Sequence, residues 1–172
     1  GVATVAGSHT PMAILAYEPG GGCLCLYHPA ERAGLVLTDA QRAVVAGADW
    51  LCVTVGPTDA TSDALRLLPG HAGLCWVVKD DPRVVTPGLA AALAARADLV
   101  CCSAAEAAFV RAACEAAGTR RDGAILIETR GGAGAQVTAH GETVFVPAEN
   151  LPVTDATGAG DTFAGGALAA LA

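Results

Sequence analysis

Short apolar runs alternate with helix-forming segments along most of this chain, and this alternation limits the fold more than any other feature. The apolar runs with the length of strands are 50–55, 74–78, 99–102 and 124–128. The segments with helical patterns are 39–46, 59–68, 87–96 and 103–117. Strand–helix–strand units favour parallel strands with helices on both faces of the sheet. The sequence therefore predicts an α/β fold built on a mostly parallel sheet.

Turn and capping signals add two hairpins and two helix starts. Apolar runs flank the turn Glu18-Pro19-Gly20-Gly21-Gly22 and, later, the pair His140-Gly141, so each turn predicts two antiparallel strands. Thr38 and Gln41 have the spacing of a capping box, and Thr86 is an N-cap candidate before a proline. The four hairpin strands are expected over 12–17, 24–28, 135–138 and 142–146.

A loop of small residues leads into the last helical pattern of the chain. It reads Asp155-Ala156-Thr157-Gly158-Ala159-Gly160-Asp161 and continues into an apolar, small-residue segment. Uncovered backbone N–H groups at a helix N-terminus, with the helix dipole behind them, bind anions. A carboxylate beside such a site suits a base that takes a proton from a hydroxyl during phosphoryl transfer. The plainer alternative is that Asp161 is an acid in the first helical turn, where the dipole also favours it.

Polar residues follow several of the expected strands directly. Asp80, Ser103 and Thr129 each come after an apolar run, and the 155–161 loop also follows a strand candidate. Ligands of parallel sheets bind at the carboxyl ends of the strands. The sequence therefore predicts one shared site at that edge of the sheet.

Charge and composition exclude several classes of partner. The 172 residues carry a formal net charge of −7, which argues against nucleic acids and anionic membrane surfaces because both attract Lys and Arg. No apolar run reaches membrane-spanning length and no signal peptide is visible, so a cytoplasmic protein is expected. The seven cysteines have neither zinc spacing nor a disulfide framework, and we expect buried, reduced thiols.

Four motifs resemble those of the ribokinase-like sugar kinases, also called the PfkB carbohydrate kinase family. The 155–161 loop resembles the signature D-T-x-G-A-G-D, with Ala156 at its second position. Residues 128–135 resemble the nucleotide loop T-x-G-x-x-G, and residues 79–83 resemble D-x-N-x-R. Ser103 to Glu106 stands where the family has N-x-x-E, with Ser in place of Asn. The four matches follow the family's order over roughly residues 74–172.

The resemblance implies a role for each matching residue. Asp161 would be the catalytic base, and the N–H groups of Gly158, Ala159 and Gly160 would stabilise the charge of the transferring phosphoryl group. The residues implied in ATP binding are Ser103, Thr129, Arg130, Gly131, Gly134 and Gly160. Glu106 would organise water bound to Mg²⁺. Asp155 and Thr157 would contribute to a monovalent-cation site, with K⁺ as the candidate ion.

Each of these assignments has a structural alternative. Ser103 and Glu106 form a sufficient capping box by themselves. The glycines of 131–134 suit a turn between two strands. The side chains of Asp155 and Thr157 are typical loop-forming hydrogen-bond partners.

The resemblance covers the middle and C-terminal portion of the family's domain. We therefore expect residues 1–172 to be a single ribokinase-like kinase domain, incomplete at both ends, that lacks the N-terminal sugar-binding part and the C-terminal end. The implied activity is ATP-dependent phosphoryl transfer to a hydroxyl of a sugar or nucleoside. The implied role of the Thr10–His28 hairpin is a lid or the edge of a homodimer.

Two other readings of the sequence remain open. The chain is alternatively a catalytically incomplete or regulatory nucleotide-binding module derived from such a kinase, which the serine at position 103 favours. It is otherwise an unrelated α/β enzyme that uses the same anion loop for another phosphorylated ligand.

Overall fold

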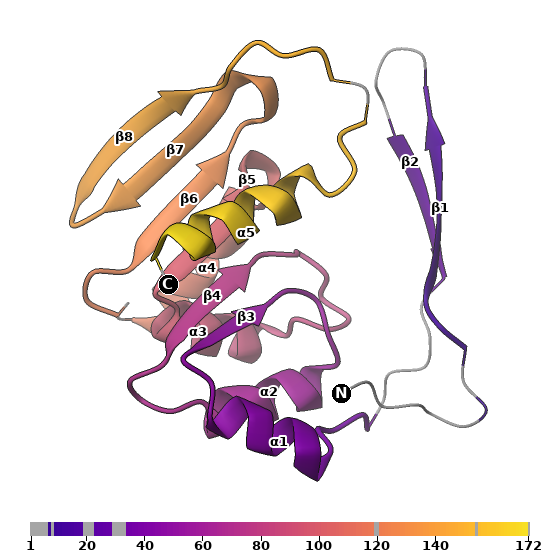
Figure 1. Cartoon of the computed structure of the whole chain (residues 1–172), viewed down its shortest axis with the longest axis vertical. Coiled ribbons are helices and arrows are strands. Elements are labelled where there is room, and N and C mark those ends of the chain that lie inside the picture. The colour runs from indigo at the N-terminus through magenta and orange to yellow at the C-terminus, as the bar shows by residue number, and fades with distance from the viewer. Residues whose placement is uncertain are drawn as a thin grey trace.

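A mixed sheet forms the centre of the molecule in the computed structural model, which describes Gly7 and residues 9–18, 23–28, 34–118, 121–153 and 155–171. Within those residues the sheet has six strands in the order β3-β4-β5-β6-β7-β8 (Figure 1). The strands are β3 (Trp50–Val53), β4 (Gly73–Val77), β5 (Leu99–Ser103), β6 (Ile125–Thr129), β7 (Gly134–Ala139) and β8 (Glu142–Pro147). β3 to β6 are parallel, whereas β7 and β8 are antiparallel to their neighbours. The predicted mostly parallel sheet is confirmed.

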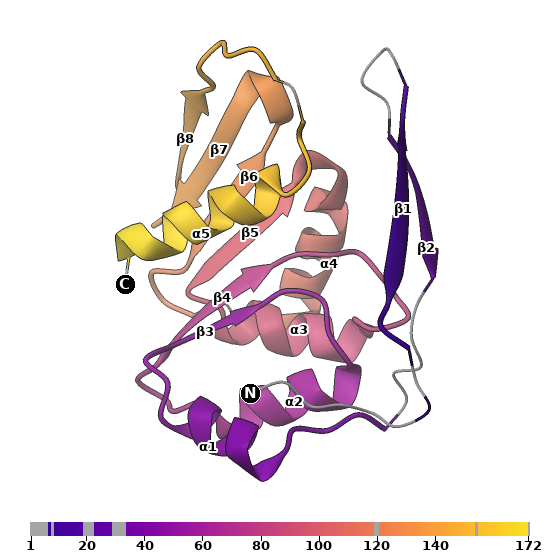
Figure 2. The same cartoon turned by 45° about the vertical axis from the view of Figure 1, so that its right-hand side comes forward.

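Helices lie on both faces of the sheet, and those between β3 and β6 connect the parallel strands (Figure 2). They are α1 (Asp39–Ala46), α2 (Thr58–Leu67), α3 (Pro87–Arg96), α4 (Ala107–Ala117) and α5 (Ala159–Leu171). The capping box of Thr38 and Gln41 opens α1, and the Thr86 hydroxyl accepts the Leu89 N–H at the start of α3. The sequence signals for these helix starts are confirmed.

The start of the expected 103–117 helix differs from the prediction. Residues Ala104–Glu106 form a 3₁₀ turn, and the α-helix begins only at Ala107. The carboxylate of Glu106 accepts hydrogen bonds from both the N–H and the hydroxyl of Ser103, at 2.9 and 2.8 Å. The Ala107 N–H bonds back to the carbonyl of Ala104, and such i→i+3 bonds tighten a first helical turn.

Two apolar layers bury the central strands. On one face, Leu74, Trp76 and Val100 pack with α3 and α4, and Phe109 of α4 meets Trp76 edge to face with ring centroids 6.2 Å apart. On the other face, the alternate residues of the same strands pack with Ala164 of α5. Because β4 and β5 are buried on both faces, their sequences are continuous apolar runs instead of alternating ones.

A buried acid links the first two helices. Asp63 of α2 is 4% exposed and forms ion pairs with Arg42 of α1 and Arg66 of α2. Its burial is tolerated because two guanidinium groups satisfy its oxygens. Within the described residues, no helix has both the length and the apolarity to cross a membrane.

A separate two-stranded sheet stands beside this body. β1 (Met12–Tyr17) and β2 (Cys23–His28) pair antiparallel, as the sequence predicts. The expected turn at Glu18 to Gly22 lies mostly outside the described residues. In both views, the hairpin stands on the side toward which the carboxyl ends of β4 and β5 point (Figures 1 and 2).

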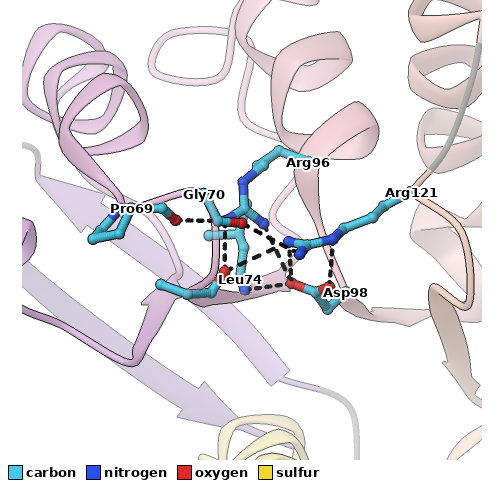
Figure 3. A network of polar contacts seen from close by, with 7 residues as sticks. Pro69, Gly70, Leu74, Arg96, Asp98 and Arg121 are labelled. Atoms are coloured by element: carbon cyan, nitrogen blue, oxygen red, sulfur yellow. Dashed lines mark hydrogen bonds and ion pairs between the residues drawn. The ribbon is translucent and has the colours of Figure 1, made fainter.

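A polar network closes the opposite, amino-terminal ends of the strands (Figure 3). The carboxylate of Asp98 accepts the N–H of Leu74 at 2.8 Å and pairs with Arg121 at 3.0 Å and Arg96 at 3.3 Å. The two arginines also donate to backbone carbonyls in the 69–72 connection that leads into β4. One carboxylate thus joins the starts of β4 and β5 to the segment before β6.

We expect Asp98→Ala to lower the free energy of unfolding by about 2 kcal/mol, because it strands the buried Leu74 N–H and removes charge-assisted bonds. Denaturant unfolding of the full chain would measure this. Glu115→Ala, which removes an exposed acid from α4, should change stability by less than about 0.5 kcal/mol. Equal effects of the two substitutions would contradict this role of Asp98.

Candidate active site

The carboxyl ends of β5 and β6 bring two of the expected site residues together. Ser103 ends β5, Thr129 ends β6, and the two are direct partners in the parallel register. The Thr129 hydroxyl donates to the carbonyl of Cys102 at 3.3 Å. Parallel pairing thus joins two motifs that lie 26 positions apart in the sequence. The expected common edge for these two residues is present.

Ser103 and Glu106 are engaged with each other. The N–H and the hydroxyl of Ser103 both donate to the same carboxylate oxygen, Oε2 of Glu106, and the Ser103 hydroxyl accepts the Glu106 N–H to complete their capping box. Both side chains are only partly exposed. The structural alternative for this pair is therefore realised, and a contact of Glu106 with metal-bound water stays a prediction.

The glycine-rich segment after β6 forms a tight turn into β7. Gly131–Ala133 is a 3₁₀ turn, and Gly131 and Gly134 adopt φ values of 56° and 124°. A Cβ on Gly134 would overlap the carbonyl oxygen of Val146 in β8. Gly134 is thus required for the close approach of β8, whatever the loop binds.

The Arg130 side chain lies along the sheet. Its guanidinium group pairs with Glu128 at 2.9 Å and donates to the amide oxygen of Gln136 at 2.8 Å. Glu128 and Gln136 face each other across β6 and β7. In this arrangement Arg130 stabilises the pairing of the two strands, and its contact with a nucleotide stays a prediction.

The loop before α5 places Asp161 in the first turn of that helix. Gly158 has a φ of 74°, a left-handed conformation that glycine adopts without strain, and the helix begins at Ala159. The N–H of Thr162 bonds to the Gly158 carbonyl at 2.8 Å. The N–H of Ala159 donates to the carbonyl of Ala156 at 3.1 Å, so an anion would have to share this donor or displace its acceptor.

Asp161 lies near the end of β3 as well. It is one of the groups that raise the pKa of the Cys52 thiol to about 11, after partial desolvation of the thiol and the neighbouring Cys75, although Cys52 as a residue is exposed. Cys52 is the penultimate residue of β3, and α5 itself contacts β4 and β5. The N-terminal turn of α5 therefore stands over the carboxyl-terminal part of the parallel strands.

Asp155 and Thr157 form a local turn that Tyr17 joins from the hairpin. The Asp155 carboxylate accepts the Thr157 N–H at 2.8 Å and the Tyr17 hydroxyl at 3.4 Å, and Tyr17 also contacts the Thr157 hydroxyl. Hydrogen bonds from Thr157, and a weaker one from Tyr17, hold the pKa of Asp155 below its usual range. The structural alternative for Asp155 and Thr157 is realised here, and their binding of a cation stays a prediction.

A second contact joins the hairpin to the loop after β4. Arg83 forms two hydrogen bonds with the Asp81 carboxylate, at 2.8 and 2.7 Å, and its guanidinium carbon lies 5.9 Å from the ring centroid of Tyr27. Neither Tyr17 nor Tyr27 was among the site residues expected from the sequence. The sequence does hold one indication of their role, because the only two tyrosines of the chain both lie in the hairpin.

The open backbone at the start of α5 fits a phosphate group better than a bare metal ion. A Cβ built on Gly158 or Gly160 would meet no atom within 4 Å, so an anion can approach this turn. Among the residues that the structure describes, no three His, Cys, Asp or Glu side chains gather as a metal site. A divalent ion would therefore need phosphate and water oxygens as further ligands, which is how Mg²⁺ usually binds with nucleotides.

A hollow of about 320 Å³ lies at the other end of the sheet. It is lined by the starts of the parallel strands, the Asp98 network and the end of α5. Ligands of parallel sheets bind at the carboxyl ends of the strands, where the glycine loops and Asp161 are. We therefore place the candidate site at the carboxyl ends.

A family model and several solved structures match this chain. The model described as "pfkB family carbohydrate kinase" matches residues 27–172. A nucleoside kinase from Burkholderia thailandensis in complex with inosine has a TM-score of 0.67 and 20% identity, over 94% of this chain and 55% of that one. A putative ribokinase II from E. coli has a TM-score of 0.71 and 18% identity, over 91% of this chain and 56% of that one.

An adenosine kinase from Sinorhizobium meliloti is similar too, with a TM-score of 0.71 and 22% identity, over 91% of this chain and 52% of that one. At these identities the structural likeness shows the fold alone. The chain spans about half the length of each of these three solved proteins. No curated protein sequence matches the chain significantly.

We expect Gly134→Ala to lower the free energy of unfolding by about 2–3 kcal/mol, because its φ is positive and its Cβ would overlap β8. Gly132→Ala is a matched control in the same loop, since a Cβ there meets no atom within 4 Å. The control should change stability by less than about 0.5 kcal/mol. Thermal or denaturant unfolding measures the stability of both variants. An unchanged stability of Gly134→Ala would refute the close approach of β8 to Gly134.

Proposed function

Since the chain belongs to the pfkB family of carbohydrate kinases, we propose that the whole protein transfers the γ-phosphoryl group of ATP to a hydroxyl of a sugar or nucleoside. The observation that carries this proposal is the first turn of α5. There, Asp161 stands beside the open backbone of Gly158 and Gly160, at the carboxyl ends of parallel strands. Within this proposal, residues 1–172 form part of one kinase domain.

Asp161 acts as the base in the proposed reaction. Its carboxylate accepts the proton of the acceptor hydroxyl, and the acceptor oxygen attacks the γ-phosphorus. The bond from that phosphorus to its bridging oxygen breaks, which leaves ADP. Negative charge on the transferring group is stabilised by the N–H groups of Gly158 and Gly160 and by the N-terminal end of the α5 dipole. The N–H of Ala159 adds to them if it exchanges its bond to the Ala156 carbonyl for one to the anion.

The nucleotide lies over the ends of β5 and β6 in this proposal. Ser103 and Thr129 are adjacent there, and the turn from Gly131 to Gly134 follows at once, so their polar atoms can line one ligand. Mg²⁺, when it is present with the nucleotide, would neutralise charge during transfer. Glu106 would hold a water of that ion, and Arg130 would contribute if it left Glu128 for a phosphate.

The acceptor is a small molecule with a free hydroxyl. The solved proteins of similar fold include kinases named for nucleosides and one named for ribose, which supports both chemical classes. The first test of acceptor class is coupled ADP release from the full-length protein with Mg-ATP and a panel of sugars and nucleosides.

A second candidate function is nucleotide binding without turnover. It is favoured by the bonds between Ser103 and Glu106, which occupy both polar side chains of that motif with each other. It predicts ATP binding by the full-length protein with no acceptor-dependent ADP release.

We expect Asp161→Asn to reduce kcat about 100-fold or more, because the amide cannot accept the acceptor proton. The dissociation constant of ATP should stay unchanged, since the loop N–H groups remain. Asp122→Asn, an exposed acid in the connection before β6, is the matched control and should keep full turnover. Wild-type kcat in Asp161→Asn would remove Asp161 from the mechanism.

We also propose that Asp155 and Thr157 help to bind K⁺, because a carboxylate and a hydroxyl are suitable oxygen ligands. Turnover should then rise severalfold when K⁺ replaces tetramethylammonium at constant ionic strength. Asp155→Asn should weaken this activation. Equal rates with both cations would dismiss the ion site without affecting the role of Asp161.

A further inference from the structure

The β1–β2 hairpin presents both of its tyrosines on one face. In the antiparallel register Tyr17 faces Cys23 and Tyr27 faces Ala13. Residues two apart along a strand share a face, so Tyr17, Leu15 and Tyr27 lie on the same side of the hairpin. This is the face that contacts the main body, through Asp155 with Thr157 and through Arg83.

Few apolar contacts hold the hairpin in place. The large apolar residues on its other face are between 57% and 60% exposed, and they are Met12, Ile14, Leu24 and Leu26. Leu15 and Tyr27, on the inner face, are still about 40% exposed. A two-stranded hairpin without an apolar partner is only marginally stable in water. Polar contacts of the inner face therefore have a large share in setting its position.

The Tyr17 contact joins the hairpin to the loop that carries the anion-binding turn. Tyr17 is the last residue of β1, and its hydroxyl reaches both Asp155 and Thr157. Asp155 also accepts the Thr157 N–H, so one carboxylate oxygen connects the hairpin with the loop backbone immediately before Gly158. Any displacement of the hairpin at Tyr17 must break these bonds or move the loop.

We propose that Tyr17 is a positioning residue, whose hydroxyl fixes the hairpin to the Asp155–Thr157 turn and thereby holds the anion-binding turn in its catalytic geometry. The catalytic part of this proposal rests on the proposed function. The Tyr27–Arg83 contact supports the other end of the hairpin, near the loop after β4. The hairpin then joins two loops at the carboxyl ends of the strands that are 72 positions apart, from Arg83 to Asp155.

Hydrogen–deuterium exchange of the full-length protein tests the attachment directly. Tyr17→Phe keeps the ring and removes only the hydroxyl. We expect exchange in peptides covering 12–17 and 155–163 to become about threefold to tenfold faster, the effect of losing one or two hydrogen bonds. Peptides from β4 and β5 should exchange as in the wild type, which separates a local release from global destabilisation.

Thr143→Val is the matched control. It removes one exposed hydroxyl that bonds to another hydroxyl, that of Thr138, in the strand pair β7–β8. Its exchange in 12–17 and 155–163 should equal that of the wild type. If Tyr17→Phe matches the control in both segments, the attachment is disproved.

Steady-state kinetics test the catalytic part. With an acceptor that the wild type uses, Tyr17→Phe should lower kcat about threefold to tenfold and leave the KM for ATP unchanged, because the 131–134 turn is untouched. Faster exchange with an unchanged kcat would overturn the positioning role. If the wild type phosphorylates no acceptor, the proposed function fails, and the exchange result still decides whether Tyr17 attaches the hairpin.

Discussion

Burial of β4 and β5 on both faces is the constraint on which the rest of the structure depends. Trp76 and Leu74 point into one apolar layer, and Cys75 and Leu99 into the other, with essentially no exposed surface. A one-residue slip would exchange the two layers and is therefore excluded. The fixed register aligns the ends of β5 and β6, and so places Ser103 beside Thr129. The precision of the candidate site is a result of this packing.

The two ends of the parallel strands are built differently. At the amino-terminal ends, Asp98 and two arginines satisfy one another and the neighbouring carbonyls, which joins three connections rigidly. At the carboxyl-terminal ends, the backbone turns at Gly131 and Gly158 face open space. The first arrangement suits stability, and the second leaves donors available for a ligand. The hollow among the strand starts lies at the end where polar groups already have partners.

Much of the fold could be predicted from the sequence, because apolar runs, capping boxes and glycine turns are local signals. Thr38 and Thr86 mark the starts of α1 and α3 correctly. Most contacts that shape the candidate site join residues far apart in the sequence, or depend on which of several acceptors a side chain binds. Tyr17 meets a loop 138 positions later, and no local pattern indicates this. Arg130 forms an ion pair with Glu128 and a hydrogen bond with Gln136, which only the β6–β7 register reveals, and its contact with a nucleotide stays a prediction.

The separation of the Asp98 network from the candidate site has an evolutionary consequence. Substitutions at exposed positions of the loops after β4, β5 and β6 leave untouched the Asp98 carboxylate, which joins the starts of the strands. Such loops can change the molecule they recognise while the chain keeps folding, since effects at distant sites without shared partners are nearly additive. A lineage carrying this scaffold can therefore diversify its ligands by exchanging the exposed residues of these loops, while Val84, Val85 and Gly134 stay in place for the fold.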